Sequence, residues 1–160
     1  MILEKLNHFE KFNFQTSFQI NDEDLENKYL ELQQKFHPDT NADKDEAEIN
    51  SILINQAYKI LKKPVLRAIY LLGLRGINID SDDCAIKPSH ENLMFIMQLR
   101  EEILDNPENK TQIKQKIKEI ITEDMPKMID SMNKENHQEA AQKLIKIKYL
   151  DKIIFDLKKR

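Results

Sequence analysis

A proline between two apolar-striped segments constrains the fold of this chain more than any other feature. Upstream of it, large apolar residues recur at spacings of four, three and four: Leu25, Tyr29, Leu32 and Phe36. That spacing is one stripe of an amphipathic helix. Pro38 ends the helix because its ring fixes φ and lacks an N–H. The pattern therefore predicts two antiparallel helices, over Asp22–Phe36 and Asp45–Leu61, joined by a short exposed tip.

The tip carries His37, Pro38 and Asp39, so an imidazole, a rigid ring and a carboxylate lie side by side. The simplest interpretation is a helix stop followed by a turn, because Asp side chains readily bond nearby backbone amides. The tripeptide alone is only suggestive, and its neighbours must decide between a turn and a functional motif.

The remaining pattern is also helical, and no strand is expected. A short helix is predicted within residues 1–14, and a further one from Pro64 that ends at Gly73 and Gly76. After a polar linker, three more helices are predicted over about 89–105, 108–132 and 138–158, with Pro126 kinking or splitting the second. We therefore expect an all-α chain with an N-terminal domain over 1–76, a linker over 77–88 and a C-terminal three-helix bundle over 89–160.

The helix from Ser89 has more apolar surface than one bundle contact needs. Ile96, Leu99 and Ile103 form an adequate inner face. Leu93 and Leu104 lie nearest to that face and would suit a wider core contact. Met94 and Met97 lie farther round and share their sector with Glu101 and Asp105. Flexible thioethers beside carboxylates favour a partner-binding surface, although a wide core contact is the alternative.

Composition narrows the function classes. The formal net charge of −3 gives no basic excess for nucleic acid. Cys84 is the single cysteine, which excludes an internal disulfide and a cluster ligand set, and is typical of a reducing compartment. No apolar run is long enough for a membrane span, and the first residues lack the build of a signal peptide, so we expect a cytoplasmic protein.

An enzyme is the rival class, but the chemistry-bearing residues are scattered. The four histidines are far apart in sequence and show no zinc-type pair one helical turn apart: His8, His37, His90 and His137. No glycine-rich phosphate loop is present. We therefore expect no catalytic residue, no metal and no cofactor. As a separate expectation, we favour a monomer.

The residues around the tip follow in a recognisable order: Lys35-Phe36-His37-Pro38-Asp39, then Ile54-Asn55-Gln56-Ala57-Tyr58-Lys59-Ile60-Leu61, Pro64, Arg67 and Tyr70. This order resembles the J-domain, the module by which co-chaperones engage DnaK-type chaperones. The resemblance implies that His37, Pro38 and Asp39 contact the chaperone ATPase, with Lys28 and Lys35 on the preceding helix assisting.

From end to end the chain resembles HscB-type co-chaperones of iron–sulfur cluster assembly. The matching stretches are Arg67-Ala68-Ile69-Tyr70-Leu71-Leu72, Leu93-Met94, Leu99-Arg100-Glu101-Glu102 and Tyr149-Leu150-Asp151-Lys152. The resemblance implies an HscA-like DnaK-type chaperone as one partner and the IscU-like scaffold protein as the other. Carried over by position, the scaffold-binding residues are Leu93, Met94, Met97, Glu101, Asp105 and Tyr149. A J-domain protein with a different client, or a bare helical adaptor, is the nearest alternative.

Two departures from the family pattern concern the chaperone contact. Thr40 stands where most J-domains carry a basic residue. Only Lys28 and Lys35 offset five acidic residues on the helix over Asp22–Phe36, so electrostatic steering should be weak, although a spacing of seven places both lysines on one face. The paired cysteines of the zinc module found in some members are also missing.

Overall fold

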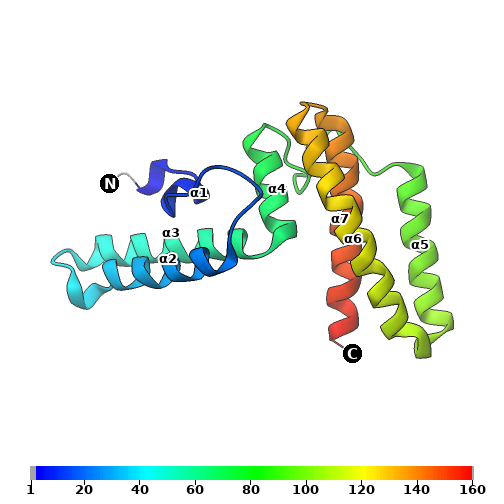
Figure 1. Ribbon diagram of the computed structural model, residues 1–160, viewed down its shortest axis with the longest axis horizontal. Coiled ribbons are helices and arrows are strands. Elements are labelled where there is room, and N and C mark those ends of the chain that lie inside the picture. Colours follow the sequence, from blue (N-terminus) through cyan, green and yellow to red (C-terminus); the bar gives the residue numbers. More distant parts are fainter. Residues whose placement is uncertain (1–2, 160) are drawn as a thin grey trace. The chain divides into compact units, whose positions relative to one another are not determined.

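The computed structural model describes residues 3–159, which contain helices, turns and loops but no strand (Figure 1). The chain divides into two compact units, and the division falls between Leu71 and Leu72. The elements in chain order are η1 Leu3–Lys5, α1 His8–Lys11, α2 Asp22–Lys35, η2 Pro38–Thr40, α3 Lys44–Lys62, α4 Pro64–Leu74, α5 His90–Asp105, η3 Pro107–Asn109, α6 Lys110–Asn133 and α7 His137–Lys158. The prediction of an all-α fold is confirmed, and each predicted long helix is present within two residues of its expected ends.

The first unit is built on the antiparallel hairpin of α2 and α3 (Figure 1). Its apolar stripes are buried, and their members are Leu25, Leu32, Phe36, Ala47, Ile54, Ala57 and Leu61. Each fully buried leucine-sized side chain stabilises the hairpin by roughly 1.5–3 kcal/mol. Asn21 caps α2 by accepting the N–H of Asp24, and Asp43 caps α3 by accepting the N–H of Glu46. These caps satisfy amide groups that no helical carbonyl reaches.

A polar and aromatic cluster joins the two hairpin helices along one flank. The rings of Tyr29 and Tyr58 stack with centroids 3.8 Å apart. The Tyr29 hydroxyl and the Gln33 amide both donate to Asn55 Oδ1. The Tyr58 hydroxyl donates to the Glu26 carboxylate, and this hydrogen bond raises the pKa of Tyr58 to about 12. The cluster fixes the register of α2 against α3 along one flank of the hairpin.

Residues 3–12 form two short elements, η1 and α1, and both pack on α3. Phe9 and Phe12 are fully buried. The His8 ring stacks on Tyr70 with centroids 4.1 Å apart, and the His8 N–H donates to the Tyr70 hydroxyl over 3.0 Å. His8 Nδ1 is buried without a hydrogen-bond partner. Desolvation, with a smaller contribution from the Lys11 charge, therefore lowers the pKa of His8 to about 4.

The first unit should lose stability as the pH falls from about 6.5 to about 4. In that window the unfolded chain binds a proton at His8 and the folded unit does not, so acid favours unfolding. We expect a loss of about 1 kcal/mol between pH 7 and pH 4.5, after discounting for the partly exposed ring. Urea unfolding of the wild-type chain and of His8→Phe at pH 7 and at pH 4.5 measures this change in the free energy of unfolding. An equal pH dependence in both proteins would contradict the assignment.

Arg67 is a buried charge that ties three parts of the first unit together. Its Nε donates to the Leu61 carbonyl over 2.9 Å, and Nη1 donates to the Phe18 carbonyl over 2.8 Å. The guanidinium also lies 5.1 Å from the Phe18 ring centroid. Burial lowers the pKa of Arg67, and the Asp22 charge opposes that shift. The loop before α2 is thereby attached to the junction of α3 and α4.

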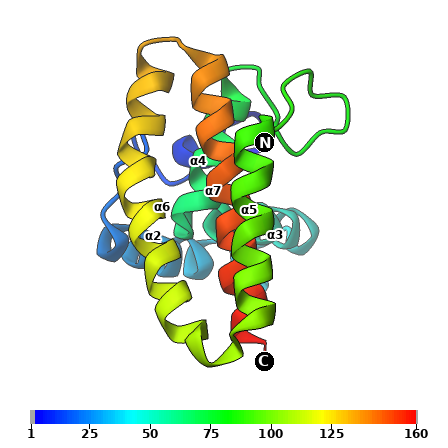
Figure 2. The ribbon, with the colours of Figure 1, turned by 90° about the vertical axis from the view of Figure 1, so that its right-hand side faces the viewer.

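The second unit is a bundle of α5, α6 and α7, with α5 and α7 parallel and α6 antiparallel to both (Figure 2). Ser89 caps α5 as predicted, accepting the N–H of Asn92. The core is formed by buried aliphatic residues of all three helices: Ile96, Leu99, Ile103, Ile113, Ile117, Leu150, Ile153 and Ile154. Close packing of α6 on α7 dominates this unit, and α5 contacts that pair through a narrower stripe.

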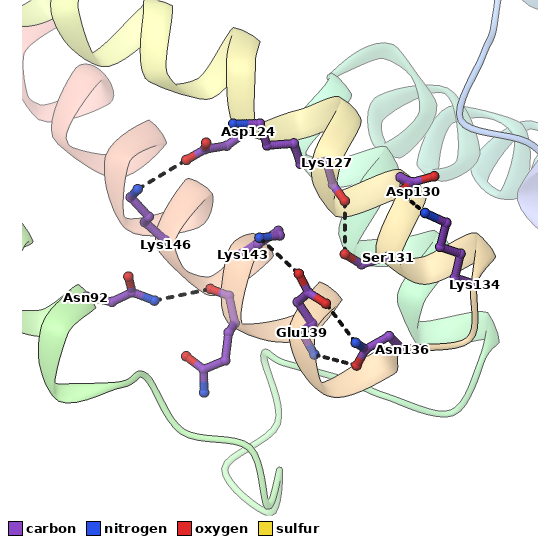
Figure 3. A network of polar contacts seen from close by, with 11 residues as sticks. Asn92, Asp124, Lys127, Asp130, Ser131, Lys134, Asn136, Glu139, Lys143 and Lys146 are labelled. Atoms are coloured by element: carbon purple, nitrogen blue, oxygen red, sulfur yellow. Dashed lines mark hydrogen bonds and ion pairs between the residues drawn. The ribbon is translucent and has the colours of Figure 1, made fainter.

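Polar contacts reinforce the α6–α7 pair (Figure 3). Lys146 Nζ lies 3.2 Å from Asp124 Oδ2 and so joins the two helices, whereas the Ser131 hydroxyl donates to the Lys127 carbonyl within α6. Asn136 caps α7 by accepting the N–H of Glu139. Such partly exposed pairs each add at most about 1 kcal/mol. The polar contacts therefore supplement an interface that is held mainly by apolar burial.

Of the kink or split predicted at Pro126, the split does not occur, and the helix end predicted at Gly73 is wrong. Pro126 does not split α6, which is continuous over Lys110–Asn133. Pro126 has no N–H to donate to the Thr122 carbonyl. Both residues are exposed, so water can donate to that carbonyl instead. Gly73 lies inside α4 and does not end it; the stop is at Gly76, whose φ of +92° lets the Ile77 N–H reach the Leu72 carbonyl.

Candidate functional site

The first candidate surface is the tripeptide loop, residues 37–41, at the tip of the α2–α3 hairpin. Phe36 is buried and ends α2, and its N–H still donates to the Leu32 carbonyl. His37 has extended backbone angles, φ −67° and ψ 134°, as expected for a residue that precedes proline. Pro38 then begins η2. The chain therefore turns sharply because of Pro38, while the buried Phe36 anchors the loop to the core.

Both polar groups of the tripeptide are exposed and lie together. The side chain of His37 is 56% exposed and that of Asp39 is 83% exposed. The Asp39 N–H donates to His37 Nδ1 over 3.1 Å, and Asp39 Oδ2 lies 3.6 Å from the same nitrogen. Because Nδ1 accepts a hydrogen bond, the imidazole carries its proton on Nε2. The loop thus offers one N–H donor and one carboxylate to a partner.

Thr40 and Asn41 hold the loop in place. Asn41 Nδ2 donates to the Lys35 carbonyl over 2.9 Å and to the His37 carbonyl over 2.8 Å. The Thr40 hydroxyl also donates to the His37 carbonyl, over 3.0 Å. These bonds satisfy carbonyls that the end of α2 leaves open. Sequence reasoning treated Thr40 only as a departure from the J-domain pattern, although a hydroxyl and an amide just after a helix end are a signal for such bonds.

Lys28 and Lys35 lie seven residues apart on the continuous helix α2, which puts them on one face. Lys28 Nζ is 3.7 Å from Glu31 Oε2, and Lys35 Nζ lies 5.4 Å from the centroid of the Phe36 ring. The nearby carboxylate offsets part of the positive potential. The face therefore presents one largely unpaired cation beside the tripeptide loop, at Lys35.

The second candidate surface, the α5 docking face, consists of Leu93, Met94, Met97, Glu101 and Asp105. All five side chains are exposed, with Met97 at 54%. The inner residues Ile96, Leu99 and Ile103 are buried, as their spacing predicted. Tyr149 on α7 is half-buried and packs at the edge of the core. Two methionines and a leucine in contact with solvent on one helix are unusual for a core element.

The alternative of a wide core contact, which the positions of Leu93 and Leu104 suited, is not what the structure has. Leu104 is 69% exposed, the highest value among the large apolar side chains of residues 3–159, and Leu93 is exposed as well. The reason lies in the bundle: α6 and α7 pack on each other, so only one stripe of α5 reaches the core. The exposed apolar row of α5 is consequently longer than the resemblance alone implies.

The carboxylates of the docking face have no partner within residues 3–159. Neither Glu101 nor Asp105 takes part in an ion pair or a side-chain hydrogen bond there, and Glu102 beside them is also free. In the same range, no three His, Cys, Asp or Glu side chains are arranged to hold a metal ion. No helix formed by these residues is long and apolar enough to cross a membrane.

Two family models match the chain: the DnaJ domain over residues 12–70 and the HSCB C-terminal oligomerisation domain over residues 89–158. The co-chaperone protein HscB homolog of Aliivibrio salmonicida is 31% identical, covering 96% of both chains. That of Acinetobacter baumannii is also 31% identical, covering 96% of this chain and 90% of the relative. Among solved structures, the chaperone HscB from Vibrio cholerae has a TM-score of 0.80 at 27% identity, covering 96% of both chains. Human co-chaperone HscB has a TM-score of 0.85 at 27% identity, and the match covers 96% of this chain and 81% of the human one.

A J-domain followed by a helical HSCB-type domain defines a J-domain co-chaperone with its own C-terminal module. Identity over nearly the whole chain is specific enough to go further: the chain belongs to the HscB family of co-chaperones. Proteins of this class stimulate the ATPase of an HscA-type DnaK chaperone in iron–sulfur cluster assembly. A DnaK-type chaperone is therefore the partner of the J-domain.

Proposed function

We propose that this chain couples an IscU-like scaffold protein to the chaperone, with the tripeptide loop contacting the ATPase and the α5 docking face holding the scaffold. The observation that carries the proposal is the exposure of Met97 and its apolar neighbours on the unit that lacks the tripeptide. The domain division that suits this role is a J-domain over 1–76, a linker over 77–88 and a scaffold-binding domain over 89–160.

At the first surface the chain would act by binding and not by chemistry of its own. His37, Pro38 and Asp39 would bind the chaperone more tightly in the state that leads to ATP hydrolysis and client capture. Only such differential binding can shift an equilibrium between partner states, because equal binding shifts nothing. The thin basic face of Lys28 and Lys35 would contribute modestly to the rate of encounter.

At the second surface Leu93, Met94 and Met97 would lose water against apolar side chains of the scaffold, and Tyr149 would form the edge of the contact. The free carboxylates of Glu101 and Asp105 would favour a basic rim on the scaffold. Holding the scaffold on the same chain as the J-domain raises its effective concentration at the chaperone, so the two binding events reinforce each other.

Removing the apolar centre of the docking face tests the scaffold half of the proposal. We expect Leu93→Ala with Met97→Ala to weaken binding to the purified IscU-like scaffold of the same organism by about tenfold or more, since central apolar anchors dominate interfaces. Isothermal titration calorimetry measures the affinity, and circular dichroism checks the fold.

The matched control removes two comparably exposed apolar side chains from the first unit, Ile49→Ala with Ile52→Ala, and should leave scaffold affinity unchanged. Unchanged affinity in the Leu93/Met97 variant would refute the proposed docking face. Unfolding of that variant would show that its two residues belong to the core.

A further inference from the structure

The exposed apolar surface of α5 continues beyond the docking face toward the C-terminal end of the helix. Leu93, Met97, Arg100 and Leu104 follow one another at spacings of four, three and four, so they form one straight row. None of these four side chains is buried. A row with this spacing is the pattern along which a second helix packs.

Helix α7 runs parallel to α5 (Figure 2). Two contacts set their register: Asn92 Nδ2 lies 3.5 Å from the Gln142 carbonyl oxygen, and Lys146 Nζ lies 5.1 Å from the Phe95 ring centroid. At equal rise per residue, Tyr149 is level with the turn that carries Met97. At this level the half-buried Tyr149 packs against the core that α5 and α7 share.

At the C-terminal end of the row, beside Leu104, lies a pocket of about 250 Å³ between α5 and α7. It is lined by Arg100, Ile103, Leu104, Ile153, Asp156 and Leu157. Four of its walls are aliphatic, and its two charged groups have opposite sign. A dry apolar cavity of about 150 Å³ accepts a benzene ring, so this pocket has room for one large apolar side chain. Leu104, exposed over 69% of its surface, stands at the mouth.

We propose that the pocket beside Leu104 is an anchor site for one large apolar side chain of the scaffold protein, presented by a basic amphipathic helix lying along the Leu93–Leu104 row. This inference rests on the proposed function and extends it to the C-terminal ends of α5 and α7. The occupant follows from three features: the pocket continues the docking face, the row has helix-packing spacing, and the free carboxylates of Glu101 and Asp105 flank it.

The test compares two exposed apolar side chains of the second unit, Leu104 on α5 and Phe155 on α7. Leu104→Ala should weaken binding of the purified IscU-like scaffold by about tenfold, because the anchor loses one wall of its pocket. The fold should be unaffected, since little of Leu104 is covered. Phe155→Ala, at a residue that is 53% exposed and lines no part of the pocket, should leave the affinity unchanged.

Three outcomes separate this inference from the proposal beneath it. If the Leu93/Met97 variant loses affinity and Leu104→Ala does not, the pocket is no anchor site, although the docking face stands. If neither variant loses affinity, both proposals fail. If Leu104→Ala shifts the sedimentation of the chain alone and leaves scaffold affinity intact, the occupant is a second copy of this chain and the inference is overturned.

Discussion

Replacing His37 by glutamine should remove most of the stimulation of the chaperone ATPase. Glutamine can still accept the Asp39 N–H through its amide oxygen, so the turn should persist, but it lacks the ring and its Nε2 donor. We expect stimulation to fall by roughly 5- to 150-fold, the span of coupling free energies of 1–3 kcal/mol. Single-turnover ATP hydrolysis by an HscA-type chaperone, with and without the variant, measures the effect.

The matched control is His90→Gln, the same exchange at an exposed histidine in the second unit. It should leave stimulation unchanged. Scaffold affinity of the His37 variant should equal that of the wild-type chain, because the docking face is untouched. Undiminished stimulation by His37→Gln would refute the assignment of the tripeptide loop as the ATPase contact.

Arg67→Leu should produce the largest loss of stability. The substitution leaves the Leu61 and Phe18 carbonyls without their donor, and each buried unsatisfied group costs about 1–3 kcal/mol. The gain from a buried leucine offsets part of this, so we expect a net loss of about 3 kcal/mol. Urea unfolding followed by near-ultraviolet circular dichroism reports mainly on the first unit, since three of the four tyrosines (Tyr29, Tyr58 and Tyr70) lie there and no tryptophan is present.

Arg75→Leu provides the comparison in the second unit. Arg75 also donates to a backbone carbonyl, that of Met132 over 2.8 Å, but it is exposed and water can replace it. Its loss should cost about 1 kcal/mol or less. Equal losses of stability in the two variants would show that burial does not increase the contribution of the Arg67 hydrogen bonds to stability.

Features governed by local chemistry could be predicted from the sequence. The hairpin followed from the apolar stripe that ends at Phe36, because a helix has one period and proline one fixed φ. The cap at Ser89 followed from the side chain that best satisfies an open amide. The exposed tripeptide followed from the same stop signal, since a turn between packed helices cannot itself be buried.

Features that depend on how helices dock could not be predicted in the same way. The exposure of Leu104 is set by the close packing of α6 on α7, which no periodicity within α5 encodes. The burial of Arg67 depends on a carbonyl 49 residues away, at Phe18. The unbroken helix at Pro126 depends on solvent reaching one carbonyl. In each case the tertiary surroundings of the residue, and not its local sequence, determine the outcome.

The hydrogen bonds from Thr40 and Asn41 affect both the rate and the affinity with which the loop can bind a partner. A tip that is already held to the end of α2 does not have to be frozen on encounter, so little conformational freedom is lost there. In the proposed contact with the chaperone ATPase, few contacts would then suffice for binding, because ordering the tip costs little free energy. Brief and repeated encounters would benefit from that combination of a small contact area and a low ordering cost.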